Sequence, residues 1–103
     1  MQITMNENCL NDMISGKKQY EAKLNKGQWK DIDIGNKITV INKNNKVVFE
    51  VSYITHYLDF KDAFLDFGEK LIPNGDLYNT YNKYYSREEI EKYGVILIKL
   101  EKI

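Results

Sequence analysis

One stretch of the chain, residues 38–57, constrains the fold more than any other. Residues 38–41 form a short run of apolar and β-branched side chains, and a longer run of this kind extends from Val47 to about Tyr57. The segment between them, residues 42–46, reads Asn-Lys-Asn-Asn-Lys and is typical of a turn. Two strand-like runs on either side of such a turn indicate a β-hairpin. The core is therefore expected to lie on an antiparallel sheet.

Further strands are predicted nearer the two ends of the chain. Residues 1–5 alternate between apolar and polar, and residues 18–24 place Tyr20, Ala22 and Leu24 on one face. Alternation of this kind is typical of a half-buried strand. Residues 94–100 read Gly-Val-Ile-Leu-Ile-Lys-Leu, which is apolar on both faces and predicts a closing strand covered on both sides.

Helices are expected between these strands. Asn6 or Asn8 can cap a helix that runs to about Ser15, and Gly16 follows where a helix end needs a left-handed residue. Residues 60–67 repeat apolar side chains at helical spacing and are followed by Gly68. The remaining expected helical segments are residues 29–32, residues 76–85, and a helix to about residue 92 that begins with a Ser86 and Glu89 capping box.

Length and element order together predict an α+β fold. The chain has 103 residues, which fits one domain, residues 1–103, with one small core. About five to six strands with inserted helices predict a small, curved, mostly antiparallel sheet.

Composition narrows the functional classes. Fifteen basic and fifteen acidic residues give a formal net charge of zero, which argues against a strongly basic nucleic-acid binder but leaves a local basic patch open. Cys9 and His56 are the sole cysteine and histidine, too few for a zinc site, and no cofactor is expected. No basic leader precedes an apolar stretch, and no apolar run is long enough to span a bilayer, so a cytoplasmic protein without membrane contact is expected.

The segment from Gly16 to Lys23 carries the main functional signal. Glu21 and Lys23 share one face of the predicted strand, and Lys17 and Lys18 come just before them. Facing inward, this group would line a cleft for an anionic or amide-bearing ligand. Facing outward, it would be an ordinary solvated strand face. Periodicity alone leaves both interpretations open.

Several other residues also have two interpretations. Tyr84 and Tyr85 belong to a tyrosine cluster with Tyr78 and Tyr81, which can either stack on bases or pack at the edge of a core. Trp29, His56 and Cys9 are expected to be structural, with Trp29 covering one end of the barrel and Cys9 packing as a small buried apolar group. Lysines 26, 30, 37, 43 and 46 would contact phosphate only if the fold gathers them on one face.

The order of several short motifs resembles the ASCH domain family. A helix ends in Gly-Lys-Lys, residues 16–18, and Glu21, Lys23, Leu24 and Asn25 follow. Further landmarks are Trp-Lys-Asp-Ile at 29–32, Ile-Gly-Asn at 34–36, Leu-Ile-Pro at 71–73, Tyr-Tyr-Ser at 84–86 and Tyr-Gly-Val at 93–95. The resemblance runs from about residue 3 to residue 100. It implies a β-barrel similar to the PUA RNA-binding fold, with residues 16–23 lining a cleft between the barrel and the inserted helices.

The resemblance implies RNA binding, with hydrolysis as an alternative. One branch of the family hydrolyses the acetyl amide of N4-acetylcytidine with a lysine, a threonine nucleophile and a later glutamate, and another member is a ribonuclease. Lys18 matches the lysine and Glu69 the glutamate, but Glu21 stands in place of the threonine. A carboxylate is a poor nucleophile toward an amide and repels an oxyanion, so binding is favoured over hydrolysis. Ala22 and Lys23 stand where the family more often has glycine and arginine.

The leading hypothesis is therefore a module that holds RNA or a nucleotide in the cleft. The residues expected to contact this ligand are Lys17, Lys18, Glu21, Lys23, Tyr84 and Tyr85. In the alternative, an enzyme acting on a nucleobase amide or on RNA, Lys18, Glu21 and Glu69 would supply the acid–base chemistry.

Overall fold

The hairpin expected from residues 38–57 lies at the centre of the sheet. The computed structural model describes all residues 1–103. In it, β3 (Lys37–Asn42) pairs antiparallel with β4 (Asn45–Tyr57), and Ile38 lies opposite Phe49. The turn between these strands is shorter than the predicted turn over residues 42–46, because Asn42 already pairs with Asn45.

Three more strands complete a five-stranded sheet in the order β1-β3-β4-β5-β2. The closing strand β5 (Val95–Lys102) pairs antiparallel with β4 on one side and with β2 (Tyr20–Leu24) on the other. β1 (Gln2–Thr4) pairs parallel with β3. The sheet is thus mixed but mostly antiparallel, and β1 and β2 are its two edges.

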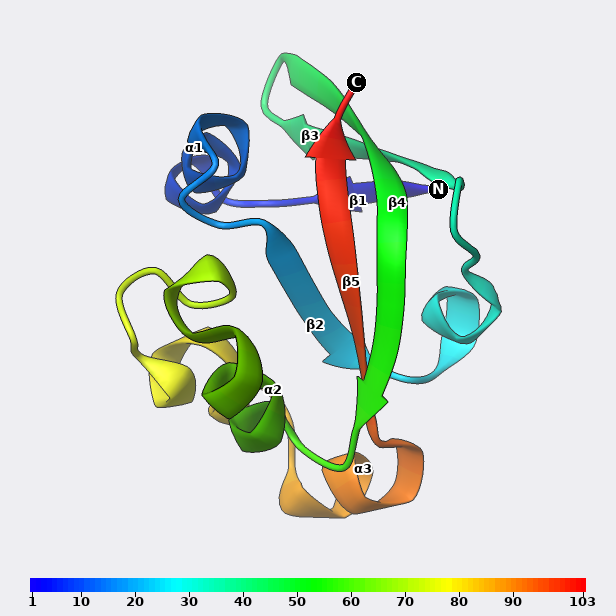
Figure 1. Ribbon diagram of the computed structural model, residues 1–103, viewed down its shortest axis with the longest axis vertical. Helices are drawn as coiled ribbons and strands as arrows, with labels where there is room; N and C mark the ends of the chain where they lie inside the picture. Colours follow the sequence, from blue (N-terminus) through cyan, green and yellow to red (C-terminus); the bar gives the residue numbers. More distant parts are fainter.

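The long strand β4 curves the sheet. Its register against β5 shifts between Val51 and Tyr53, so that Ser52 is an extra residue on β4. A bulge of this kind bends a strand and increases its twist. The sheet accordingly forms a half-barrel, with β5 and β4 running through the centre of Figure 1. The prediction of an α+β fold around a small, curved, mostly antiparallel sheet is confirmed, and the sheet has five strands.

Helices and short helical turns fill the connections between strands. Asn6 caps α1 by accepting a hydrogen bond from the Cys9 N–H, and Gly16 ends it in the left-handed conformation. Ser86 and Glu89 form the expected capping box of α3. The helical elements are α1 (Glu7–Ser15), η1 (Gly27–Asp31), α2 (Phe60–Phe67), η2 (Gly68–Lys70), the π-helical turn η3 (Tyr78–Asn82) and α3 (Arg87–Tyr93).

The sheet separates two apolar clusters. α1 covers one face, where Leu10 and Met13 pack against β3, β4 and β5. α2, η3 and α3 cover part of the other face, where Phe60 and Tyr81 pack against β2 and β5. β5 supplies buried side chains to both clusters in alternation, as its two apolar faces predict.

One strand begins later than its sequence pattern suggests. Residues 18–24 were expected to be extended, but β2 starts at Tyr20. The Lys18 N–H donates to the carbonyl oxygen of Asp12, and the Gln19 N–H donates to that of Lys70. These N–H groups therefore bond to neighbouring segments, and the link joins the sheet only through the Gln19 carbonyl oxygen, which accepts from the Leu100 N–H of β5. None of the helices has the length and apolar content that a membrane crossing requires.

Candidate functional site

A cavity of about 1250 Å³ opens beside β2, at the edge of the sheet. α1, β2 with the link that precedes it, residues 69–74 and residues 79–85 form its wall. These segments are far apart in the sequence, but Figure 1 places α1 and the segment around η3 on either side of β2. The volume is above the usual range for small-molecule sites, so a ligand the size of a nucleotide fits inside.

Lys18 and Glu21, which the sequence singles out, are the two buried charged residues of the chain. Lys18 is 3% exposed and Glu21 is 6% exposed, and both line the cavity. Their ammonium and carboxylate groups lie 3.7 Å apart, between Nζ and Oε1. Desolvation makes a buried ion pair costly unless further hydrogen bonds complete it, so the surroundings of both groups matter.

Tyr81 supplies the missing hydrogen bonds between the two charges. Nζ of Lys18 donates to the Tyr81 hydroxyl at 3.2 Å and also to the carbonyl oxygen of Leu71. The Tyr81 hydroxyl in turn donates to Oε1 of Glu21 at 2.6 Å. Two of the three Lys18 protons are thus donated to Leu71 and Tyr81, and the ammonium group faces Glu21 as an ion pair at 3.7 Å.

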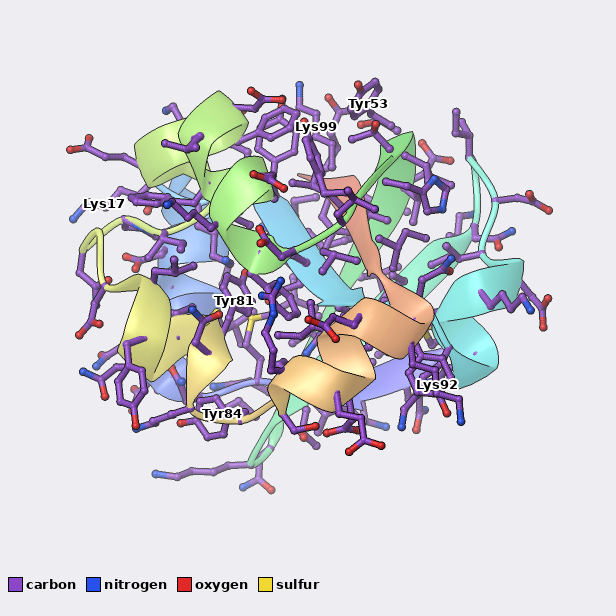
Figure 2. The ribbon with its side chains drawn as sticks, turned by 90° about the horizontal axis from the view of Figure 1, so that it is seen from below. Lys17, Tyr53, Tyr81, Tyr84, Lys92 and Lys99 are labelled. Carbon is purple, nitrogen blue, oxygen red and sulfur yellow. The ribbon has the colours of Figure 1, made fainter.

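The Tyr81 side chain is held firmly in place. Its ring stacks on Phe60 of α2, with centroids 4.7 Å apart and planes inclined by 7°. Figure 2 shows Tyr81 inside the molecule, whereas Tyr84, three residues along, lies at the periphery. Stacked aromatic pairs add stability beyond the area they bury. The ring therefore fixes the position of the hydroxyl that joins Lys18 to Glu21.

Glu21 is ionised at neutral pH. Burial alone would raise the pKa of its carboxyl, but the positive charges of Lys18 and Lys23 and the hydrogen bonds from Tyr81 and from the Ala22 N–H outweigh it, and the pKa lies below its ordinary value. The pKa of Tyr81 lies well above its ordinary value, because burial and the adjacent Glu21 charge both oppose ionisation. Tyr81 thus stays a hydrogen-bond donor to a charged carboxylate.

One oxygen of Glu21 remains available. Oε1 accepts from the Ala22 N–H at 2.9 Å and from Tyr81, and it faces Lys18. Oε2 accepts no hydrogen bond from the protein. An ionised carboxylate has acceptor sites on both oxygens and no proton to donate. The base of the cavity therefore offers an acceptor to a ligand that carries an N–H or O–H group.

Cys9 lies on the cavity wall, on the side of α1. It is half-buried, and burial together with the negative charge of Glu21 raises the pKa of its thiol to about 11. The expected role as a buried apolar group fits this protonated thiol, although the side chain also borders the cavity.

The rim of the cavity is charged but balanced. Lys17 and Lys70 are exposed, Lys23 is half-buried, and none of the three forms an ion pair. Carboxylates offset these lysines, so the cavity as a whole is not a strongly basic groove. The charged residues that line it are Lys17, Lys18, Lys23, Lys70, Glu7, Asp12, Glu21 and Glu69.

The seven residues expected to bind a ligand or to take part in catalysis all line this one cavity. Glu21 and Lys23 come from β2, Lys17 and Lys18 from the link before it, and Glu69 from η2. Tyr84 is 65% exposed, and Tyr85 stacks on Phe60 at 5.1 Å between centroids. Glu69 is exposed and makes no hydrogen bond to Lys18 or Glu21. No group of three or more His, Cys, Asp or Glu side chains is placed to hold a metal ion.

Tyr81 is the site residue that sequence reasoning missed. It was grouped with three other tyrosines as a stacking or core-edge residue, without a link to Glu21. Sixty positions separate Tyr81 from Glu21, and no local pattern connects them. The helical spacing of Phe60 and Ala63 marks the surface on which Tyr81 packs, but not the tyrosine that packs there.

No family model matches the sequence, and no curated protein matches it. Among solved structures, the hypothetical protein PH0355 has a TM-score of 0.85 at 26% identity, covering 99% of this chain and 97% of that chain. Protein PF0455 from Pyrococcus furiosus has a TM-score of 0.82 at 24% identity, covering 99% of this chain and 96% of that one.

The ASCH protein from Zymomonas mobilis has a TM-score of 0.61 at 12% identity, covering 97% of this chain and 65% of that chain. A variant of the same protein gives a TM-score of 0.62. A sequence identity of 12% supports a shared fold and nothing further. The structural neighbours of this chain thus include ASCH proteins, and the chain has their α+β fold.

Proposed function

We propose that the cavity binds a nucleotide, either free or as part of a single-stranded RNA. The observation that carries this proposal is the ionised, buried Glu21, whose Oε2 atom accepts no hydrogen bond from the protein. A nucleobase or ribose supplies the N–H or O–H donor that this oxygen lacks, for example an exocyclic amine or a 2′-hydroxyl.

In this proposal, different parts of the ligand occupy different depths of the cavity. Two Lys18 protons are taken by Leu71 and Tyr81 and its charge is paired with Glu21, so an anionic group at the base would have to compete with the Glu21 carboxylate. The ammonium groups of Lys17 and Lys70 lie at the rim, where a phosphate keeps part of its hydration and meets a positive charge. The distribution of charge therefore fits a ligand whose neutral N–H or O–H groups lie at the base of the cavity and whose phosphate lies at its mouth.

An exposed ring is available for stacking at the same rim. Tyr84 lines the cavity with 65% of its surface exposed, and Lys83 lies over one face of its ring at 5.1 Å from the centroid. The other face is free of such a contact. Stacking of a base on an aromatic side chain contributes roughly 1–3 kcal/mol. The ASCH-type fold and the resemblance found in the sequence support the same class of ligand.

Calorimetric titration with the four ribonucleoside monophosphates tests the proposal, with wild-type protein compared with Glu21→Gln. The amide keeps the shape of the side chain but removes the charge and adds donors, so affinity should fall at least tenfold. Glu50→Gln on β4 is the matched control, since Glu50 does not line the cavity. Thermal unfolding of both variants establishes that they are folded.

A second pair of variants separates the rim from the base. The double variant Lys17→Gln/Lys70→Gln should weaken the binding of nucleotides more than the binding of the corresponding nucleosides, because only nucleotides carry phosphate. Unchanged affinity in Glu21→Gln, or no binding of any nucleotide or of a mixed single-stranded RNA to the wild-type protein, would overturn the proposal.

A further inference from the structure

We infer that single-stranded nucleic acid leaves the cavity along a lysine track formed by Lys23, Lys26 and Lys92, and that the chain therefore binds an oligonucleotide rather than a lone nucleotide. This inference rests on the proposed function and specifies its ligand. The track runs from β2 across the start of η1 to the end of α3.

The track starts at the cavity itself. Lys23 lines the cavity, and its Nζ lies 5.7 Å from the centroid of the Trp29 ring on η1. An ammonium group over an aromatic face is attracted by the ring quadrupole, which holds the flexible lysine in one place. Lys23 forms no ion pair, so its charge is available at the boundary between the cavity and η1.

The next two lysines share a single ring. Nζ of Lys26 lies 5.0 Å from the centroid of Tyr93, and Nζ of Lys92 lies 5.2 Å from the same centroid. Tyr93 is half-buried against the apolar cluster under α2 and α3, so it is a fixed support. Lys26 directly precedes η1, and Figure 2 shows Lys92 on the same side of the molecule as η1. Both ammonium groups are therefore held at the Tyr93 ring, where the start of η1 meets the end of α3.

These lysines suit phosphates better than bases. The Trp29 and Tyr93 rings each have at least one lysine ammonium group over them. These rings therefore hold the positive charges in position, and the charges are expected to contact phosphates. Lys26 also lies 3.6 Å from Glu89 and keeps 48% of its side chain exposed. Glu89 offsets part of this charge, which limits the effect expected from Lys26 alone. The test therefore removes Lys26 and Lys92 together and measures the change in oligonucleotide affinity.

The hairpin between β3 and β4 provides a matched control. Lys43 and Lys46 are exposed lysines without ion pairs. The connection between β3 and β4 that carries them lies at the top of Figure 1, whereas α3 lies at the bottom. Changing two lysines to glutamine there alters the net charge by the same amount. A non-specific electrostatic effect would lower oligonucleotide affinity equally in both double variants. A lysine track would lower it only in the variant that removes Lys26 and Lys92.

The experiment measures fluorescence anisotropy of labelled oligoadenylates of increasing length, from the dinucleotide to the decanucleotide, at several salt concentrations. In the wild-type protein, affinity should rise with length beyond the dinucleotide. In Lys26→Gln/Lys92→Gln, the decanucleotide should bind roughly three- to tenfold more weakly, and the salt dependence should fall by about one unit of slope. Dinucleotide binding should be unchanged, as should all binding by Lys43→Gln/Lys46→Gln.

The outcomes separate this inference from the proposed function. Dinucleotide binding without any gain from length overturns the track and leaves the cavity proposal standing. Decanucleotide binding that depends on Lys26 and Lys92 but not on Glu21 would overturn the cavity proposal and, with it, a path that starts in the cavity, and would leave only a separate lysine surface. Equal losses in the two double variants, or equal competition by a polyglutamate of the same charge, would also overturn the track as a nucleic-acid surface.

Discussion

The Tyr81 hydroxyl donates a 2.6 Å hydrogen bond to Oε1 of Glu21, joining η3 to the edge strand β2 across sixty positions of sequence. The same hydroxyl accepts a hydrogen bond from Nζ of Lys18. A neutral tyrosine thus lies between two buried charges and partners both. This arrangement makes the contribution of each member to stability and to binding measurable.

Replacing Tyr81 with phenylalanine should destabilise the fold by about 1–3 kcal/mol, because a buried donor and a buried acceptor each lose a partner. The ring can still stack on Phe60, so the change isolates the hydroxyl. The free energy of unfolding in urea measures the effect. Tyr84→Phe is the control, since the Tyr84 hydroxyl makes no hydrogen bond and its removal should cost less than about 0.5 kcal/mol. Equal stability of the two variants would contradict the assigned role.

Removing the charge of Lys18 should cost more than removing the Tyr81 hydroxyl. Lys18→Met leaves Glu21 buried without its ion-pair partner, a situation that typically costs about 3–5 kcal/mol. In a Glu21→Gln background, the same change should cost clearly less, because no buried charge is left unpaired. A double-mutant cycle from urea unfolding measures this coupling. The exposed pair of Arg87 and Glu91 should give a coupling below about 1 kcal/mol, and a similar value for Lys18 and Glu21 would refute the prediction.

Stability should fall in acid partly because of Glu21. Its pKa is lowered in the folded state, so the unfolded state binds its proton more readily. Its contribution is fully present above the ordinary value of 4.5 and is lost as the pH falls through the lower folded pKa. The stability difference between wild-type protein and Glu21→Gln should therefore shrink below pH 4.5, as followed by urea unfolding across the acid range. A difference that does not change with pH would mean that Glu21 is not held ionised.

Much of the fold could be predicted from local patterns in the sequence. The hairpin, the helix over Phe60–Phe67 and the Ser86 capping box all depend on residues close together in the chain. The start of β2 could not be predicted in the same way. The N–H groups of Lys18 and Gln19 bond to Asp12 and to Lys70, and the contact with Lys70 exists only in the folded chain.

Only part of the site could be predicted from the sequence, because local patterns do not show contacts between distant segments. Alternation places Glu21 and Lys23 on one face, and both do line the cavity. The sequence gives no sign that Lys18 is buried, because lysine is rarely buried unless it is paired. Its partners, Tyr81 and the Leu71 carbonyl oxygen, come from segments more than fifty positions away. Lys18 was expected to contact a ligand directly, and it does line the cavity, but two of its protons are donated to Leu71 and Tyr81, which no local pattern indicates.

The Cys9 thiol offers a direct probe of the cavity. Its pKa of about 11, against an ordinary 9.0, lowers the thiolate fraction at pH 8 by about a hundredfold, so alkylation by iodoacetamide should be correspondingly slow. The rate should keep rising with pH beyond 9, whereas the same cysteine in urea-unfolded chain should level off near 9. Glu21→Gln should speed labelling, because it removes the negative charge that opposes thiolate formation, and a nucleotide in the cavity should slow it by covering the thiol. A rate in the folded protein that levels off near pH 9, followed by mass spectrometry, would show that Cys9 is neither shielded nor close to the Glu21 charge.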